Sequence, residues 1–429
     1  MNNAVSRADA IVQVGGSRGS GVGGHRWKIL GIGFAANAAF SAVISGLPAT
    51  TVQMRSAYSL DTAQVGAALA ATGLGIALSE VPWGLLTDRL GDRRVLLTGL
   101  TLTALVLAAM AAWLGPAAPN AWMPLVAAFG VIGLVGGSIN AASGRAVMAW
   151  FGAGERGLAM GIRQTALPAG GVLGALLLPV VVSAWGFAAA YALLAVLCAA
   201  CVAGTAAWLH EPPFPDTRST GEPAAGGSVL RDASAWRMVA GMGLLCVPQI
   251  AVLSFTAVFL NDVARLEVAQ TTAALVAYQL ASAALRIWSG RWTDRYGNRH
   301  GFLQACSVVC VAVFLLLSGL AIAAQRVEWI GVLAPVLFSV LVVGGAAGSC
   351  WHGVAFTELA VQAGAARVGT ALALGNTFVF GSYFLTPLLV PALLAHGGWP
   401  LAWAAVAACA CASGPLLRSR AVPVRPSTH

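Results

Sequence analysis

Twelve apolar runs dominate the chain and set the strongest limit on its fold. They cover residues 29–53, 63–86, 95–115, 122–148, 157–183, 187–209, 238–260, 271–290, 301–324, 329–356, 368–394 and 399–417. Each is close to the length that spans a bilayer as a helix, about 20 residues. Of the 429 residues, 58% are hydrophobic and only 9% are charged, so most of the chain cannot face water. We therefore expect an all-α integral membrane protein with twelve transmembrane helices.

The longest polar interval, residues 210–237, divides the runs into two sets of six. Its Pro- and Gly-rich sequence is typical of a flexible linker. We expect an N-terminal six-helix bundle at 29–209 and a C-terminal one at 238–417. The polar ends, 1–28 and 418–429, are expected to be tails. The first of them lacks an apolar core segment, which predicts a disordered tail rather than a cleaved signal peptide.

A charged pattern between the second and third runs recurs between the eighth and ninth. The copies read Gly84-Leu-Leu-Thr-Asp88-Arg89-Leu-Gly91-Asp-Arg93-Arg94 and Gly290-Arg-Trp-Thr-Asp294-Arg295-Tyr-Gly297-Asn-Arg299-His300. The second copy follows the first by 206 residues, about half the chain. At a slightly larger spacing, Asn376-Thr377 follows Gln164-Thr165. A repeat at a fixed spacing predicts two duplicated bundles that run in the same direction through the membrane.

The basic residues predict how the chain is oriented. If the N-terminus is inside, 18 of the 24 Lys and Arg residues fall in cytoplasmic segments, and the outer loops hold only Arg55, Arg265 and Arg326. The other three, Arg145, Arg163 and Arg286, lie within apolar runs. Cytoplasmic loops carry the excess of Lys and Arg in membrane proteins. We therefore expect both termini to be cytoplasmic and the chain to lie in the inner cell membrane.

The repeated pattern closely resembles the signature of the major facilitator superfamily between helices 2 and 3. The matching residues are Gly84, Asp88, Arg89, Gly91, Arg93 and Arg94, and then Gly290, Asp294, Arg295, Gly297 and Arg299. The resemblance implies two pseudo-symmetric six-helix bundles and a latch that closes them at the cytoplasmic face. Physically, glycine allows close helix approach, and an aspartate can face the positive N-terminus of a neighbouring helix. The alternative is that these arginines only set the topology.

Arg286 is the main candidate for substrate binding. A charge inside the membrane is costly, so it marks a functional position by default. Monocarboxylate and oxalate-type carriers of the superfamily have an arginine four residues before the second-half glycine, where it binds the substrate carboxylate, and Arg286 is similar in position. A guanidinium suits that role because its planar fork holds a carboxylate by two charge-assisted bonds. Alternatively, Arg286 only braces the bundle.

The equivalent residue in the first half is Glu80, four residues before Gly84. The two opposite charges could pair across a central cavity, where an incoming anion would compete, or they could lie on separate faces. Arg163 could add a second cationic contact, or it could reach back to the cytoplasm. Further residues that could line the cavity are Tyr278, Gln279, Asn37 and Asn376, although a single polar residue in a membrane helix more often bonds a neighbouring helix.

The coupling ion is a separate question. Proton-coupled monocarboxylate carriers have an acid one turn before the arginine, whereas this chain has Ser282 there. Protons therefore enter elsewhere, or the protein is an exchanger or uniporter. The titratable candidates are Glu80, His352 and Glu358, and His352 also fits the role of a packed, hydrogen-bonded residue.

Several function classes are disfavoured by the residue patterns. The basic residues are scattered in short loops, which argues against nucleic-acid binding. No nucleophile with a base, metal-ligand cluster or phosphate loop is evident, so we expect no enzyme activity, no catalytic residue, no metal and no cofactor. The first hypothesis is a secondary transporter of a small organic anion, a monomer in the lipid bilayer with protons as a candidate coupling ion. The alternatives are a proton-driven multidrug efflux antiporter and a non-transporting membrane sensor.

Overall fold

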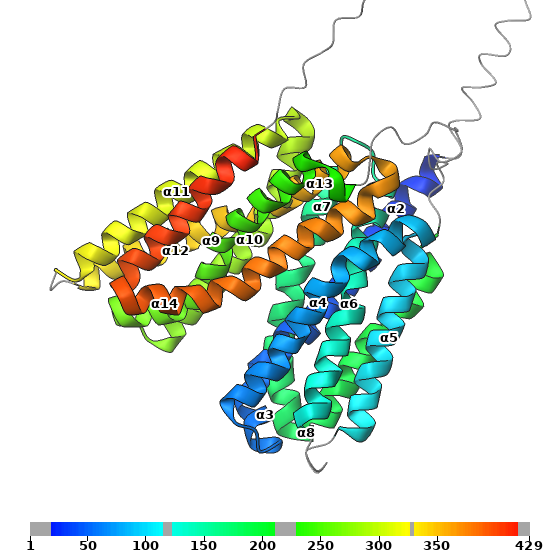
Figure 1. Cartoon of the computed structure of the whole chain (residues 1–429), viewed down its shortest axis with the longest axis horizontal. Coiled ribbons are helices and arrows are strands. Elements are labelled where there is room, and N and C mark those ends of the chain that lie inside the picture. The colour runs from blue at the N-terminus through cyan, green and yellow to red at the C-terminus, as the bar shows by residue number, and fades with distance from the viewer. Residues whose placement is uncertain (1–18, 115–121, 211–228, 327–329, 419–429) are drawn as a thin grey trace, which may run out of the picture.

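The computed structural model describes residues 19–114, 122–210, 229–326 and 330–418, and Figure 1 shows their arrangement. The elements of the N-terminal half are α2 (Gly19–Gly46), η1 (Leu47–Thr50), α3 (Thr51–Ala57), α4 (Thr62–Leu90), α5 (Asp92–Trp113), α6 (Trp122–Trp150), α7 (Arg156–Gln164) and α8 (Ala166–Trp208). Helix α2 begins at Gly19, ten residues before the predicted span at 29–53, and the rest of the predicted tail lies outside the described residues.

The C-terminal half repeats this order. Its elements are η3 (Val229–Arg231), α9 (Ala233–Ala264), α10 (Val268–Tyr296), α11 (Arg299–Ala324), α12 (Ile330–Ser349), α13 (His352–Ala363), η4 (Ala365–Arg367) and α14 (Val368–Leu416). The described residues form helices, turns and bends without a strand. Most of the predicted linker, 211–228, lies outside the described residues.

The predicted spans and the helices agree closely, with two kinds of difference. Helices α8 and α14 each contain two predicted spans, joined at Gly186 and Gly398, whose φ angles of 78° and 65° favour glycine. Conversely, the predicted spans 157–183 and 329–356 are interrupted, the first between α7 and α8 and the second between α12 and α13. Within the described ranges, nine helical stretches are long and apolar enough to cross a membrane, and two of these hold both arms of α8 and of α14.

The helix breaks reveal the internal duplication more fully than the charged pattern does. Gly398 follows Gly186 by 212 residues, and Pro391 follows Pro179 by the same number. This is also the spacing from Gln164 to Asn376. The second part of each half is therefore displaced by 212 residues rather than 206, since the loops between the repeats differ in length.

Each half has its own apolar core. The N-terminal core includes Phe40, Phe129 and Tyr191, and the C-terminal core includes Phe259, Phe314 and Trp403. Close packing within each half makes each one a stable body. The two halves approach each other at the end that carries the charged repeats, near α7, α13 and the beginning of α14, and their ribbons diverge toward the other end (Figure 1). We call these the motif end and the opposite end.

Candidate functional site between the two halves

The first contact between the halves joins the end of α4 to the beginning of α14. Helix α4 ends at Leu90, because Gly91 has a φ of 87° that interrupts the helix. In the last turn, Asp88 Oδ1 accepts a hydrogen bond from the backbone N–H of Gly369 at 2.7 Å, and Oδ2 accepts one from that of Thr370 at 2.8 Å. The Thr370 hydroxyl adds a third bond at 2.6 Å. The carboxylate thus meets the unpaired amides and positive dipole end of α14.

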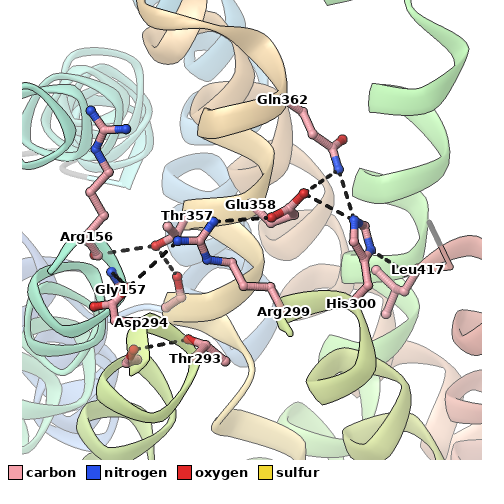
Figure 2. Close-up of polar contacts among 12 residues, drawn as sticks. Arg156, Gly157, Thr293, Asp294, Arg299, His300, Thr357, Glu358, Gln362 and Leu417 are labelled. Carbon is pink, nitrogen blue, oxygen red and sulfur yellow. Dashed lines mark hydrogen bonds and ion pairs between the residues drawn. The ribbon is translucent and has the colours of Figure 1, made fainter. Parts of the chain in front are cut away.

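The second contact repeats this geometry between α10 and α7 (Figure 2). Asp294 Oδ1 accepts from the backbone N–H of Gly157 at 2.9 Å, and Oδ2 accepts from that of Leu158 at 2.8 Å. Helix α10 ends at Tyr296 because Gly297 has a φ of 73°. Each aspartate therefore bonds the N-terminus of a helix in the opposite half. We call these two the outer contacts.

The glycines of the repeats let the helices come this close. A Cβ atom on Gly84 would lie 2.5 Å from the Cβ of Ala373 and 2.7 Å from the carbonyl oxygen of Gly369. A Cβ atom on Gly290 would lie 2.1 Å from the carbonyl oxygen of Gly157. Real Cβ contacts are not this short, so only glycine fits at either position while the two helices touch.

In the first repeat, a buried arginine stands beside the outer contact. Arg145 of α6 donates from Nη1 to Asp92 Oδ1 at 2.8 Å, and its Nε lies 3.8 Å from Asp88 Oδ1. Neither Arg145 nor Asp92 is among the predicted site residues. The available signal was an arginine inside an apolar run, level with the charged repeat, but nothing local indicates that its partner lies 53 residues away.

In the second repeat, the corresponding charges come from the motif and from α13 (Figure 2). Arg299 lies 3.8 Å from Asp294 Oδ1 and 3.5 Å from Glu358 Oε2, and His300 lies 3.1 Å from Glu358 Oε1. Gln362 also donates to Glu358, at 3.0 Å. The structure therefore brings Glu358, one of the three coupling candidates, into a cluster of basic side chains at the motif end.

The remaining motif arginines, Arg89, Arg93, Arg94 and Arg295, are exposed at the motif end. Arg93 donates to the Ala206 carbonyl of α8 at 2.9 Å, and the guanidinium of Arg295 lies 5.6 Å from the ring centre of Tyr296. In the part of the chain that the structure describes, these four side chains make no hydrogen bond to the opposite half. Their gating role stays a prediction.

A second pair of contacts lies two helical turns further from the motif end. Arg286 is 2% exposed and bonds both halves: Nε donates to the Ser349 carbonyl at 3.0 Å, and Nη1 donates to the Gln164 carbonyl of α7 at 2.6 Å. The Gln164 oxygen can accept because residue 168 is proline, which has no N–H for the usual helical bond to residue 164. Among the described residues, Arg286 Nη2 has no hydrogen-bond partner.

Glu80 of the N-terminal half makes the equivalent contact with the C-terminal half. It is fully buried, and its Oε1 accepts from Asn140 Nδ2 at 2.8 Å, while Oε2 accepts from Asn376 Nδ2 of α14 at 3.4 Å. Glu80 and Arg286 do not pair with each other across a central cavity, because α4 packs against α14 and α10 packs against α7. Each charge meets the opposite half separately. We call these the inner contacts.

Arg163 braces the N-terminal half instead of reaching the cytoplasm. It is 4% exposed, and Nη2 donates to the Asn140 carbonyl at 2.6 Å. Its Nε donates to Ser143 Oγ at 3.1 Å, and Nη2 lies 3.5 Å from Asn37 Oδ1. Asn37 also donates to Ser143 Oγ at 2.7 Å. These two predicted cavity residues therefore bond three helices of one half to each other.

Polar side chains with unused hydrogen-bonding capacity surround Arg286. The charge of Arg286 interacts with Tyr278 and Tyr383, and Gln249 Nε2 donates to the Tyr383 hydroxyl at 3.2 Å. Three of the buried atoms that have no hydrogen-bond partner in the described structure belong to this group of residues: Gln249 Oε1, Gln164 Nε2 and Ser282 Oγ. Buried polar atoms are normally bonded, so free ones beside a charge mark a candidate ligand site.

The other predicted residues take different positions. Gln279 is partly buried, and the described structure gives its side chain no hydrogen bond. His352 is buried, its ring is stacked on Trp351 at 3.9 Å between centres, and its Nδ1 lies 3.0 Å from the Ser349 carbonyl oxygen. This arrangement fits a packed residue. No group of three or more His, Cys, Asp and Glu side chains suited to a metal ion occurs in the described ranges.

Comparison with known proteins agrees with this architecture. A model of the Major Facilitator Superfamily matches residues 29–378. The chain belongs to the major facilitator superfamily. Members of the superfamily are transporters that bind small molecules in the membrane, so this is a multi-pass membrane transporter and not an enzyme.

Relatives within the superfamily confirm the fold over nearly the whole chain. The uncharacterized MFS-type transporter Rv2994 of Mycobacterium tuberculosis is 29% identical over 405 residues, which are 93% of this chain and 86% of that one. The proton:xylose symporter XylE aligns with a TM-score of 0.71 at 14% identity, over 92% of this chain and 95% of XylE. The human organic anion transporter TETRAN gives a TM-score of 0.69 at 14% identity, covering 92% and 99%.

Proposed function

We propose that this transporter moves a small organic anion, such as a carboxylate, across the inner membrane by alternating access. The observation that carries the proposal is Arg286, a buried guanidinium between the two halves that retains a free donor at Nη2. The fold alone does not identify the substrate, because the similar solved structures at 14% identity include both a sugar symporter and an organic anion transporter. The choice rests on the chemistry of Arg286.

The contacts between the halves support alternating access. The outer and inner contacts are hydrogen bonds and glycine contacts on four helices, and all of them lie from the motif end to the middle of the bundle. Such contacts can be exchanged for water without exposing a large apolar core. With both termini in the cytoplasm, this arrangement is the outward-facing state, closed at the motif end, and the monomer would open there to release its substrate.

The surroundings of Arg286 suit an anion. A carboxylate could accept from Arg286 Nη2, from the unpartnered Gln164 Nε2 and from the Ser282 hydroxyl. Charge-assisted bonds of this kind are roughly twice as strong as neutral ones. The position of the arginine, four residues before the second-half glycine, is also that of the monocarboxylate and oxalate-type carriers, which supports the same substrate class.

Anion binding would also act on the contact between the halves. Arg286 Nη1 holds the Gln164 carbonyl at 2.6 Å, and a carboxylate is a stronger acceptor than a carbonyl. An anion that draws the guanidinium away from Gln164 weakens an inner contact. The substrate therefore binds more tightly to the state that is open at the motif end than to the closed state. This difference in affinity shifts the population toward the open state. Glu80, the buried acid of the other inner contact, is the candidate proton carrier.

Transport in liposomes tests the anion site. We expect purified protein to take up small labelled carboxylates such as oxalate, and Arg286→Gln to lower the initial rate by about 10- to 100-fold, the equivalent of a lost charge-assisted bond. Arg291→Gln is the matched control, because Arg291 is exposed on the same helix. Wild-type uptake in Arg286→Gln would refute the anion site. Dependence on an imposed pH gradient would distinguish proton coupling from exchange.

A further inference from the structure

A cavity of about 650 Å³ lies within the C-terminal half, between α9 and the two arms of α14. Its walls are formed by residues 240–247 of α9, by one face of residues 377–393 in the first arm of α14, and by residues 405–409 of the second arm. The volume is within the range of ligand sites, about 300 to 1,000 Å³. None of these residues belongs to the outer or inner contacts.

The duplication places different residues at this position in the two halves. In the N-terminal half, a Cβ on Gly170 would lie 2.0 Å from the Ala38 carbonyl oxygen, and a Cβ on Gly174 would lie 2.8 Å from the Gly46 Cα. Helices α8 and α2 therefore touch. At the spacing of 212 residues, Ser382 and Thr386 take the places of these two glycines. Ser382 reaches across to the Gly243 carbonyl of α9, and the cavity lies beside this contact.

The lining selects an apolar ligand. No lining residue is charged, and two of the hydroxyls are bonded to the backbone: Ser382 donates to the Gly243 carbonyl at 2.7 Å, and Thr377 donates to the Ala373 carbonyl at 3.1 Å. The rest of the wall is aliphatic or aromatic apart from Thr386 and Cys409. A polar substrate would lose its hydration without gaining partners here, whereas an alkyl chain would lose nothing.

The cavity reaches the exposed surface of α14. Two of its lining residues, Leu385 and Leu389, are 51% and 57% exposed, and the adjacent Phe384 and Leu388 are 54% and 58% exposed. Such an apolar outer surface on a membrane helix contacts lipid chains. We propose that the cavity between α9 and α14 binds an acyl chain of a membrane phospholipid, which enters beside Leu385 and Leu389.

The position of the site gives the lipid a structural role. The first arm of α14 carries Gly369 and Thr370, which bond Asp88, and Asn376, which bonds Glu80. Thr377, next to Asn376, lines the cavity. An acyl chain in the cavity therefore packs against the same helix, α14, that makes both first-repeat contacts with α4. The binding site itself does not depend on what the protein transports.

Photocrosslinking tests the site in the intact protein. In liposomes that contain a phospholipid with a diazirine in its acyl chain, peptide mapping should find adducts on the lining of α9 and α14. Gly381→Leu should lower them by about fivefold or more, because a Cβ there meets nothing within 4 Å and leucine fills the space without a clash. Gly319→Leu on α11, equally free of contacts and outside the cavity, is the control and should leave the adducts unchanged.

Two native thiols provide a second measurement. Cys409 lines the cavity and Cys411 is exposed two residues later. Added phospholipid should slow labelling of Cys409 in delipidated protein by an apolar maleimide and leave Cys411 unaffected. Adducts spread evenly over all exposed apolar helices, adducts retained in Gly381→Leu, or protection of Cys409 by a hydrophobic drug but not by phospholipid would each overturn the proposal. A Gly381→Leu protein that fails to fold leaves the Cys409 measurement to decide.

Discussion

Asp88 and Asp294 make the same kind of contact with the opposite half, but they accept different numbers of hydrogen bonds. Both carboxylates accept two backbone N–H bonds from the first turn of a helix in the opposite half. Asp88 also accepts from the Thr370 hydroxyl, at 2.6 Å. Each carboxylate also has an arginine at 3.8 Å, Arg145 beside Asp88 and Arg299 beside Asp294. The first-repeat contact is thus the one with more hydrogen bonds, and we expect its loss to have the larger effect.

Substitution of each aspartate by asparagine tests this difference. Asparagine keeps the size but removes the charge and one acceptor, so Asp88→Asn should slow anion uptake into liposomes by about tenfold or more, the equivalent of losing one bond to a charged group. Asp294→Asn should slow it less. Thr370→Val, which removes only the hydroxyl, should fall between wild type and Asp88→Asn. Equal rates in Asp88→Asn and wild type would exclude a gating role for this carboxylate.

At the scale of elements, a proline determines where Arg286 binds. Helix α7 ends at Gln164, and Pro168 supplies no N–H to the Gln164 carbonyl, which therefore accepts from Arg286 at 2.6 Å. In the second half, residue 380 is phenylalanine at the equivalent position, and Asn376 uses its side chain to reach Glu80. The two inner contacts are symmetric in position and different in chemistry.

Pro168→Ala tests whether the substrate anion competes with the Gln164 carbonyl for Arg286. An alanine N–H can bond the Gln164 carbonyl within the helix, so Arg286 loses a partner and its Nη1 donor becomes free for the anion together with Nη2. We expect the apparent KM for the anion to fall by about two- to tenfold, the equivalent of one net hydrogen bond. Pro179→Ala, further along the same helix and outside the contacts between the halves, should leave KM unchanged. A higher KM in Pro168→Ala would contradict the competition between anion and carbonyl.

The sequence predicted local features well and partners poorly. The helix spans, the division into halves and the repeats followed from apolar runs and spacing, because these are properties of neighbouring residues. The partner of Arg286 could not be found in this way, since Gln164 lies 122 residues from it in the other half. The same applies to Arg145 and Asp92 and to the cluster around Glu358.

For the whole molecule, the pseudo-twofold arrangement means that one rigid-body movement must break all four contacts. Each half has its own apolar core, while the described hydrogen bonds between halves lie from the motif end to the middle of the bundle. The equilibrium between the two states therefore depends on a few polar bonds and not on either core. Contacts that are broken in one movement contribute separately to its free energy.

The effects of Asp88→Asn and Asp294→Asn should therefore add in the double variant. Spin labels at Ser56 and Gln325, both exposed at the opposite end, report the separation of the halves there, in a background without Cys409 and Cys411. We expect each single variant to increase the population with a short label distance, and the double variant to do so by the product of the two ratios, within about a factor of two. Because the carboxylates lie in different helix pairs, neither relies on the other for its geometry. A double variant no different from Asp88→Asn alone would mean that one contact holds the closed state and that the second repeat has lost this role.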